Sequence, residues 1–216
     1  MSREDPQLDR PQPAVGLTAE ERYRLLLELS RKVRGTLDLG ETLDRLLDLV
    51  RSIVEYDAAG IFVLNEDVLA GDRRQGLIAG VAQRGFRPRP LESDPMIFRG
   101  QGITGHVIRT GECVVAPDVR LDSRYVVGRE STLSEIAVPI TVEERTIGAL
   151  NLESDRLGAY GEQHLDALRF FAEAAAVAVD KAMLHRGLLE KQRLEAQLRV
   201  AHQVQSRLLP QAPPAL

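Results

Sequence analysis

The chain has 216 residues, of which 44% are hydrophobic and 28% charged, a balance typical of a soluble globular domain with a sizeable core. The formal net charge is −4, only 4% of residues are aromatic and Trp is absent. These values argue against a general nucleic-acid binder and against a protein that binds anionic membranes. Cys113 is the only cysteine, which excludes an intramolecular disulfide or a cysteine-built metal cluster and favours a cytoplasmic location. No stretch reads as a signal peptide or a membrane span.

The first part of the chain predicts a disordered end and two helices. Residues 1–16 combine three prolines with mixed charges, which favours disorder. A capping box from Thr18 to Glu21 then begins a predicted dimerisation helix over residues 17–35. A second helix is expected after Asp38. Its apolar side chains recur at helical spacing: Leu43, Leu46, Leu47, Val50, Ile53 and Val54.

The middle of the chain predicts strands. Apolar segments at 58–64, 76–83 and 113–116 indicate three of them, and a short helix between glycines is expected before the third. A hairpin follows, with apolar runs at 136–140 and 147–152 on either side of a charged turn. The turn, predicted over residues 141–146, lacks the Gly that favours the tightest hairpins. In the first run the alternation separates two faces, one with Ile136, Val138 and Ile140 and the other with Glu135, Ala137 and Pro139.

The last part of the chain predicts one long helix from about residue 162 to 209, with Gly161 as its N-cap. Leu194, Ala201 and Leu208 are seven residues apart, so residues 181–209 are expected to form a signalling helix or coiled coil. Residues 210–216 form a proline-rich linker. The residues predicted to dimerise are Leu25, Leu29, Leu184, Leu188, Leu194, Leu198, Ala201 and Leu208.

This order of elements predicts an α+β fold, with a central antiparallel sheet, flanking helices on one face and loops on the other. Residues 36–180 resemble a GAF domain, the small-molecule sensor fold of signalling proteins. The likeness rests on GITGHVIRTGE, on CVVAPD, and on EIAVPI followed by RTIGALNLES. The resemblance implies a regulatory sensor that binds a small molecule or a partner.

A second resemblance concerns the segment LEAQLRVAHQVQSRLLPQAPP. It is similar to the helix and linker that precede the catalytic domain of SpoIIE-like PPM-type serine/threonine phosphatases, with Gln205, Leu208, Leu209 and Pro210 at the matching positions. This resemblance implies a homodimeric module without a catalytic centre, which controls an attached phosphatase expected after Leu216. The alternative is a GAF fold retained only as a dimerisation scaffold.

The candidate pocket combines polar residues of the hairpin with residues of the preceding loops. Glu135 and Asn151 are polar residues on apolar strands, so they line a pocket or face solvent at an edge. Asp118 and Tyr125 close the same pocket or, alternatively, cap a turn and pack as a lid. His106 faces the pocket or satisfies a local hydrogen bond. The candidate ligand-binding residues are Phe98, Ile103, His106, Asp118, Tyr125, Glu135 and Asn151.

Several other chemistries are not expected. GQGITG at residues 100–105 matches GxGxxG but lacks the preceding strand and the long following helix of a dinucleotide site. His164, His185 and His202 have no metal-site spacing and are expected to be solvated, so neither a metal nor a cofactor is predicted. Cys113 is expected to act as a small hydrophobe within its strand. Sulfoxide-reducing GAF enzymes need several cysteines, and the signature of cyclic-nucleotide GAF domains is missing.

Overall fold

The computed structural model describes residues 18, 20, 39–64, 78–86 and 101–208. The chain divides into two compact units, Met1–Val179 and Asp180–Leu216. The strands are β1 Ala58–Leu64, β2 Ile78–Arg84, β3 Val114–Ala116, β4 Ser134–Val142 and β5 Arg145–Ser154. The α-helices are α2 Leu39–Arg51, α5 Gly102–Thr110 and α6 Leu165–Leu208, and short 3-10 helices cover Val119–Leu121 and Glu162–His164.

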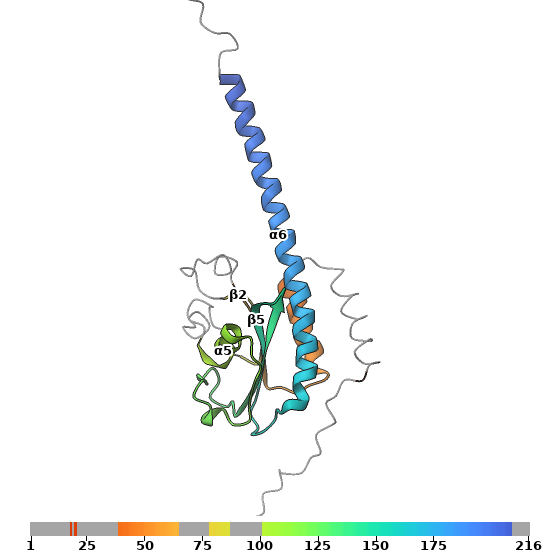
Figure 1. Ribbon diagram of the computed structural model, residues 1–216, viewed down its shortest axis with the longest axis vertical. Helices are drawn as coiled ribbons and strands as arrows, with labels where there is room; N and C mark the ends of the chain where they lie inside the picture. The colour runs from red at the N-terminus through yellow and green to blue at the C-terminus, as the bar shows by residue number, and fades with distance from the viewer. Residues whose placement is uncertain (1–17, 19, 21–38, 65–77, 87–100, 209–216) are drawn as a thin grey trace, which may run out of the picture. The chain divides into compact units, whose positions relative to one another are not determined.

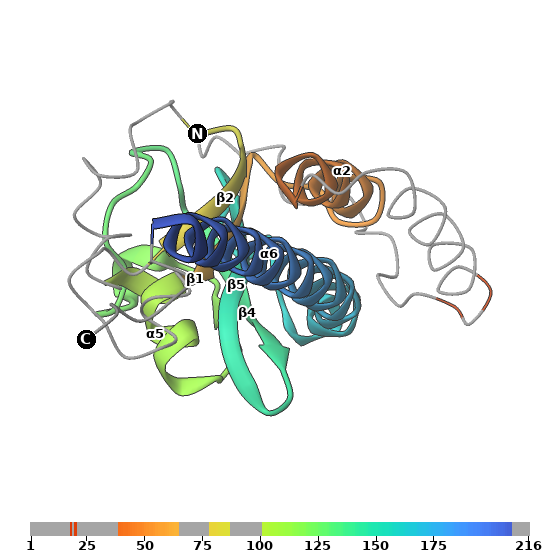
Figure 2. The same cartoon turned by 90° about the horizontal axis from the view of Figure 1, so that it is seen from above.

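The five strands form one antiparallel sheet in the order β2-β1-β5-β4-β3. Figures 1 and 2 place α5 on one face of this sheet, and α2 with the first part of α6 on the other. The predicted α+β fold, with a central antiparallel sheet, flanking helices and a long C-terminal helix, is confirmed.

Helix α2 is fixed to the sheet by an apolar stripe and by an ion-pair cluster. The helix buries Leu43, Leu46, Leu47 and Val50, the positions that its sequence spacing predicts. Arg84 at the end of β2 contacts the carboxylates of Asp44 at 2.6 Å and Asp48 at 3.2 Å. Because Arg84 is part of the strand, β2 ends one residue later than the predicted segment 76–83. The helix ends at Arg51, so Ile53 and Val54 belong to the following turn.

The β4–β5 hairpin closes with a tighter turn than the sequence predicts. Its ladder extends to the pair Val142 and Arg145, which leaves only Glu143 and Glu144 in the turn. Both have positive φ, 47° and 67°, the left-handed region that two-residue hairpin turns require. The predicted six-residue turn at 141–146 is therefore wrong. The long ladder on either side holds two non-glycine residues in a conformation that such residues rarely adopt.

A β-bulge in β5 sets the register of the hairpin. Thr141 pairs with Thr146, whereas Ile140 pairs with Gly148, so Ile147 is an extra residue between the two pairs. From the pair Ile140 and Gly148 to the pair Ser134 and Ser154, the ladder is offset by one residue relative to the pairs next to the turn. The shift places Ala137 opposite Asn151, and Glu135 opposite Glu153.

The region that leads into α6 departs from the sequence predictions in two details. Cys113 was predicted to lie within the strand, but β3 begins one residue later, at Val114. The Cys113 side chain is half-buried. His164 is buried, and its Nδ1 accepts a hydrogen bond from the Gly161 N–H at 3.0 Å. Its burial lowers the pKa of the imidazole, so the prediction that His164 is solvated is wrong. The imidazole here takes the place that Glu or Gln has in a capping box.

The predicted long helix is present as the 3-10 turn Glu162–His164 followed by α6. No helix among the described residues is long and apolar enough to cross a membrane. The predictions for residues 1–16, for the helix at 17–35 with Leu25 and Leu29, and for residues 210–216 lie outside the described residues.

Gly148 is predicted to be essential for the contact between β5 and β1. A Cβ at this position would lie 2.2 Å from the backbone carbonyl oxygen of Phe62, which only a backbone shift could relieve. We expect Gly148→Ala to lower the free energy of unfolding by more than about 2 kcal/mol in urea denaturation. Gly128→Ala is the control, because its Cβ would meet no atom closer than 3.9 Å. Equal stability of the two variants would contradict this packing.

Candidate functional site

Three buried polar side chains lie together on the face of the sheet that α5 covers. They are Glu135, Asn151 and Glu153, with exposed fractions of 3%, 2% and 5%, and we call them the polar floor. Asn151 Nδ2 donates a hydrogen bond to Glu135 Oε1 at 3.3 Å. Thr132 Oγ1 donates to Glu153 Oε2 at 2.5 Å. The floor therefore brings two carboxyl groups directly opposite each other across the β4–β5 ladder.

The burial of the floor changes the charge that it carries. Desolvation, with the neighbouring Glu153 as the second cause, raises the pKa of Glu135 to about 8. Burial also raises the pKa of Glu153, against the opposing effects of the Thr132 hydrogen bond and the Arg129 charge. Two carboxylates this close and this buried resist ionising together. At neutral pH the Glu135 carboxyl therefore retains a proton.

Asn151 presents a hydrogen-bond acceptor that the described residues leave unused. Its Oδ1 is fully buried and has no hydrogen-bond partner within the described part of the chain. On the neighbouring strand, a Cβ at Gly60 would lie 2.9 Å from this oxygen and 2.5 Å from the Phe62 ring. Only glycine at this position leaves room for both groups. A buried acceptor without a donor costs about 1–3 kcal/mol, so this oxygen favours a partner with a donor group.

The loop between β3 and β4 holds two guanidinium groups near the floor, and both are already paired. Arg124 Nη2 lies 2.6 Å from Asp122 Oδ2, and Arg129 Nη1 lies 3.0 Å from Asp155 Oδ1. The Tyr125 hydroxyl of the same loop donates to the Arg129 carbonyl oxygen at 3.3 Å. Burial, with Glu153 as the next cause, raises the pKa of Tyr125 to about 12, so its phenol stays neutral. Both guanidinium charges are therefore paired, although the buried Arg129 Nη1 makes no well-aligned hydrogen bond within the described residues.

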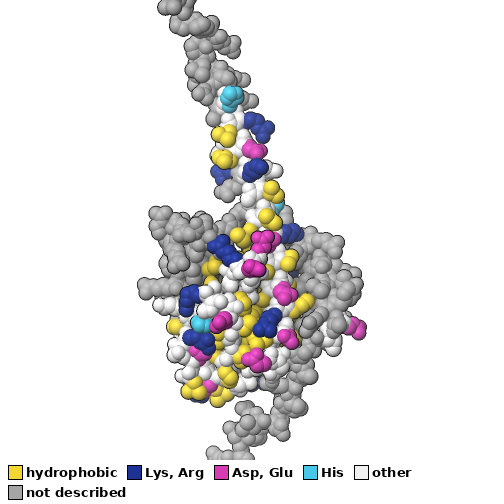
Figure 3. Space-filling model, in the orientation of Figure 1, with side chains coloured by type: hydrophobic (Ala, Val, Ile, Leu, Met, Phe, Trp, Pro, Cys, Tyr) yellow, Lys and Arg dark blue, Asp and Glu magenta, His cyan; other side chains and the backbone are white. Residues whose placement is uncertain are grey.

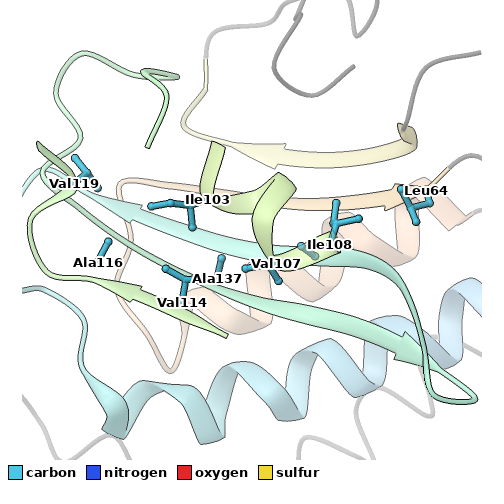
Figure 4. Close-up of a cluster of buried hydrophobic side chains, with 9 residues drawn as sticks. Leu64, Ile103, Val107, Ile108, Val114, Ala116, Val119 and Ala137 are labelled. Atoms are coloured by element: carbon cyan, nitrogen blue, oxygen red, sulfur yellow. The ribbon is translucent and has the colours of Figure 1, made fainter. Parts of the chain in front are cut away.

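Next to the floor, α5 covers the sheet with an apolar cluster (Figure 4). Ile103, Val107 and Ile108 of the helix pack against the sheet, where Ala137 and Ala149 provide small side chains below them. Leu64, Val114, Ala116 and Val119 complete the cluster, with Tyr125 packed against it. The large side chains of α5 and the small ones of the sheet complement each other in size.

The structure brings together only some of the seven predicted site residues. Glu135 and Asn151 share the floor, and Tyr125 lies in the loop beside it. Ile103 is a core residue of the apolar cluster, and His106 is half-buried on α5.

Two predicted residues lie elsewhere. Asp118 caps the Val119–Leu121 turn, and its Oδ2 lies 2.7 Å from the guanidinium of Arg120. Of the two roles predicted for Asp118, closing the pocket or capping a turn, the structure shows the second. Phe98 lies outside the described residues.

Glu153 and Thr132 are the site residues that the sequence did not indicate. Glu153 lies two residues after Asn151 in β5, and residues two apart in a strand lie on the same face of the sheet. This spacing is the signal from which the sequence could have placed Glu153 beside Asn151. Counting pairs outward from the Glu143–Glu144 turn places Glu135 opposite Leu152, however, because it omits the bulge at Ile147. Without the true register, Glu153 reads as a charged residue at the end of a strand.

A separate groove of about 560 Å³ lies between β3, β4 and the start of α6. Its lining includes Cys113, Arg169, Glu112 and Glu173, and none of the predicted site residues. A hydrogen bond with the Cys113 thiol is the main cause that raises the pKa of Arg169. Among the described residues, no group of three or more His, Cys, Asp or Glu side chains could hold a metal ion.

Comparisons with known proteins agree on the fold. Residues 36–180 match the family model of the GAF domain. The chain is 28% identical over 200 residues to the Nif-specific regulatory protein of Azospirillum brasilense, a match that covers 88% of this chain and 30% of that protein. The chain thus spans about a third of the length of this curated relative.

Two solved structures illustrate the range of proteins with this fold. The GAF domain of an Acinetobacter phosphoenolpyruvate-protein phosphotransferase is 19% identical with a TM-score of 0.61, over 77% of this chain and 97% of that one. The free methionine-R-sulfoxide reductase of Neisseria meningitidis is 19% identical with a TM-score of 0.59, over 77% and 93%. At this identity the likeness concerns the fold, which regulatory and enzymatic proteins share.

The raised pKa of Glu135 predicts a specific dependence of stability on pH. Its folded-state pKa of about 8 lies above the ordinary value of 4.5, so the unfolded chain releases this proton first. The contribution of Glu135 to stability is therefore complete below about pH 4.5 and is lost as the pH rises towards 8. Gln does not titrate, so the stability of the Glu135→Gln variant relative to the wild type should improve across this window by an amount on the order of a few kcal/mol.

Urea denaturation of both proteins at steps between pH 5 and pH 8.5 measures this difference. Glu130→Gln, at an exposed position of the neighbouring loop, is the control and should give a curve parallel to the wild type. A constant difference between wild type and Glu135→Gln at all pH values would contradict a buried, protonated Glu135.

Proposed function

This chain belongs to the GAF domain family, and we propose that it is the regulatory sensor module of a signalling protein, binding a small molecule at the polar floor. The observation that carries the proposal is the floor itself. Glu135, Asn151 and Glu153 are buried in a sheet whose other buried side chains are mainly apolar. Burying such groups is costly, and buried titratable groups with a shifted pKa are typical of binding sites.

The path from the floor to an output begins with the position of Asn151 and Glu153 on β5. This strand leads directly to Gly161 and His164, where α6 begins. We infer that ligand binding changes the position of β5 and thereby the arrangement of α6. Such coupling requires two arrangements of the helix that bind the ligand with different affinity.

The second unit supports a dimeric output helix. Leu184 and Leu198, with exposed fractions of 64% and 62%, are two heptads apart, and Leu194 and Leu188 are exposed beside them. Figure 3 shows hydrophobic side chains along this segment, separated by charged ones. The leucines of this helix are exposed within the described part of the chain, so a second copy of the same helix is the occupant that its seven-residue spacing favours. Ala201 and Leu208 continue the same spacing.

We further propose that the module controls an attached output domain. The resemblance of residues 194–214 to a phosphatase linker favours a PPM-type serine/threonine phosphatase. The chain covers 30% of its Azospirillum brasilense relative, a protein named as a regulator, so a module of this kind occurs within a longer chain. A single cysteine argues against a sulfoxide reductase activity. The full reading frame beyond codon 216 tests this proposal, because an output domain of another class would replace the phosphatase.

A dimerisation scaffold is the second candidate function, and the apolar cluster favours it. Side chains of α5 fill the space above Ala137 and Ala149, which leaves only the floor region of this face for a ligand. In a scaffold the floor would retain water in place of a ligand.

Ligand binding predicts a shift in thermal stability. A screen of nucleotides and small metabolites should include compounds that raise the melting temperature, since a ligand that binds only the folded state stabilises it. The same compounds should lose at least tenfold in affinity when Asn151 is changed to Leu, which removes both hydrogen-bonding groups at similar size. Asn151→Leu is checked for folding by circular dichroism. A uniformly flat screen would contradict the sensor proposal and support the scaffold.

If two copies pair through this helix, charged substitutions in the leucine stripe should lower the molecular mass measured in solution. We expect the double variant Leu194→Asp with Leu198→Asp to shift a dimer towards monomer in light scattering, because charges would then face each other in the helix interface. Gln192→Asp with Ala196→Asp is the matched control, as it adds the same charge away from the stripe. An unchanged mass for the first variant would contradict pairing through this segment.

A further inference from the structure

We propose that the polar floor binds the ammonium group of a small organic amine. This inference rests on the proposed sensor function and assigns the chemical class of its ligand. The floor presents three groups that accept hydrogen bonds, the carboxyls of Glu135 and Glu153 and the amide oxygen of Asn151. A primary ammonium has three N–H donors and one positive charge, which complements this set.

The buried amide oxygen is the observation that separates a ligand site from a merely acidic cluster. Asn151 is 2% exposed, and its Nδ2 is held by Glu135 at 3.3 Å. Its Oδ1 has no donor within the residues that the structure describes. In this orientation the carboxyl of Glu135 holds the amide nitrogen, and the oxygen remains available to a donor.

The surroundings of the floor disfavour the two other classes of charged ligand. An anion would meet the two carboxyls of the floor, and the guanidinium groups of Arg124 and Arg129 that could offset this repulsion are already ion-paired with Asp122 and Asp155. Arg129 Nη1 is a buried donor without a well-aligned hydrogen bond, but Asp155 at 3.0 Å balances its charge. A calcium ion takes about six to eight oxygen ligands, more than two carboxyls and one amide supply in a buried site. In the described part of the chain, no third His, Cys, Asp or Glu joins the two carboxyls as a metal-binding group.

The proposal also explains the proton that Glu135 carries in the free protein. The charged and titratable groups that act on this carboxyl are Glu153 of β5, Asp122, Arg124 and Tyr125 of the loop between β3 and β4, and Tyr160 before α6. Glu153 and Asp122 disfavour its ionisation, whereas the hydrogen bond from Asn151 and the charge of Arg124 favour it, and burial outweighs both. An ammonium placed between the carboxyls reverses this balance, so Glu135 ionises on binding and its proton passes to the solvent. Binding should therefore release about one proton near pH 7 and become tighter as the pH rises to about 8.

The test uses the full chain and a panel of primary amines from isobutylamine to tyramine, each beside its N-acetyl derivative. Thermal shift identifies binders, and calorimetry in phosphate and in HEPES, neither of which is a primary amine, then gives the number of protons released. We expect at least one amine to bind, its N-acetyl derivative to bind at least tenfold more weakly, and roughly one proton to be released per site at pH 7. The affinity should fall roughly tenfold or more in Glu135→Gln and stay unchanged in Glu130→Gln.

The proton count needs no variant, so the test stands even if Glu135→Gln fails to fold. Binding only of succinate, or only of Ca²⁺ or Mg²⁺, would overturn the ammonium site while the sensor function stands. Equal binding of an amine and its N-acetyl derivative, or binding without proton release, would overturn it as well. A panel and a metabolite screen that both give no binder would contradict the sensor function together with this inference.

Discussion

One extra residue in β5, Ile147, decides which side chains share the face of the sheet below α5. The bulge at this residue places Glu135 opposite Glu153 and Ala137 opposite Asn151. In an unshifted ladder Glu135 would lie opposite Leu152, and Asn151 opposite Ile136. Since a one-residue shift moves every side chain to the other face, Asn151 would then lie among the large apolar side chains that face α2 and α6. The candidate site exists only in the register that the bulge creates.

The two faces of the hairpin carry different kinds of buried side chain. Towards α2 and α6 the strands carry Ile136, Val138, Leu150 and Leu152, all fully buried. Burial of such side chains stabilises the fold by about 1.5–3 kcal/mol each. Towards α5 the same strands carry the small residues below the apolar cluster and the polar floor, and only the burial of the floor costs stability. The apolar face thus offsets the cost of a buried carboxyl pair and of an unpaired amide oxygen.

The sequence predicted the elements well because periodicity and caps are local signals. The helical spacing of Leu43, Leu46 and Val50 and the alternation along β4 are both present in the structure. The exact ends were harder to predict, since Arg84 extends β2 only because aspartates of α2 lie beside it.

The site was predicted in part. Glu135 and Asn151 are visible as polar residues in apolar strands, but their partner Glu153 depends on the bulge, which no local pattern indicates. The burial of His164 likewise depends on Tyr160, whose ring packs edge-on against the imidazole at 5.8 Å.

The connection between the floor and α6 is rigid, and this determines how a signal can pass. After Glu153, Asp57 accepts hydrogen bonds from Ser154 Oγ at 2.9 Å and from the Asp155 N–H at 2.7 Å. The Tyr160 hydroxyl then donates to the Glu55 carbonyl oxygen at 3.2 Å. The segment between β5 and α6 is thereby fastened to the residues that lead into β1. In the proposed sensor function, a change in the charge of the floor would therefore reach the start of α6 as a joint displacement of β1 and β5.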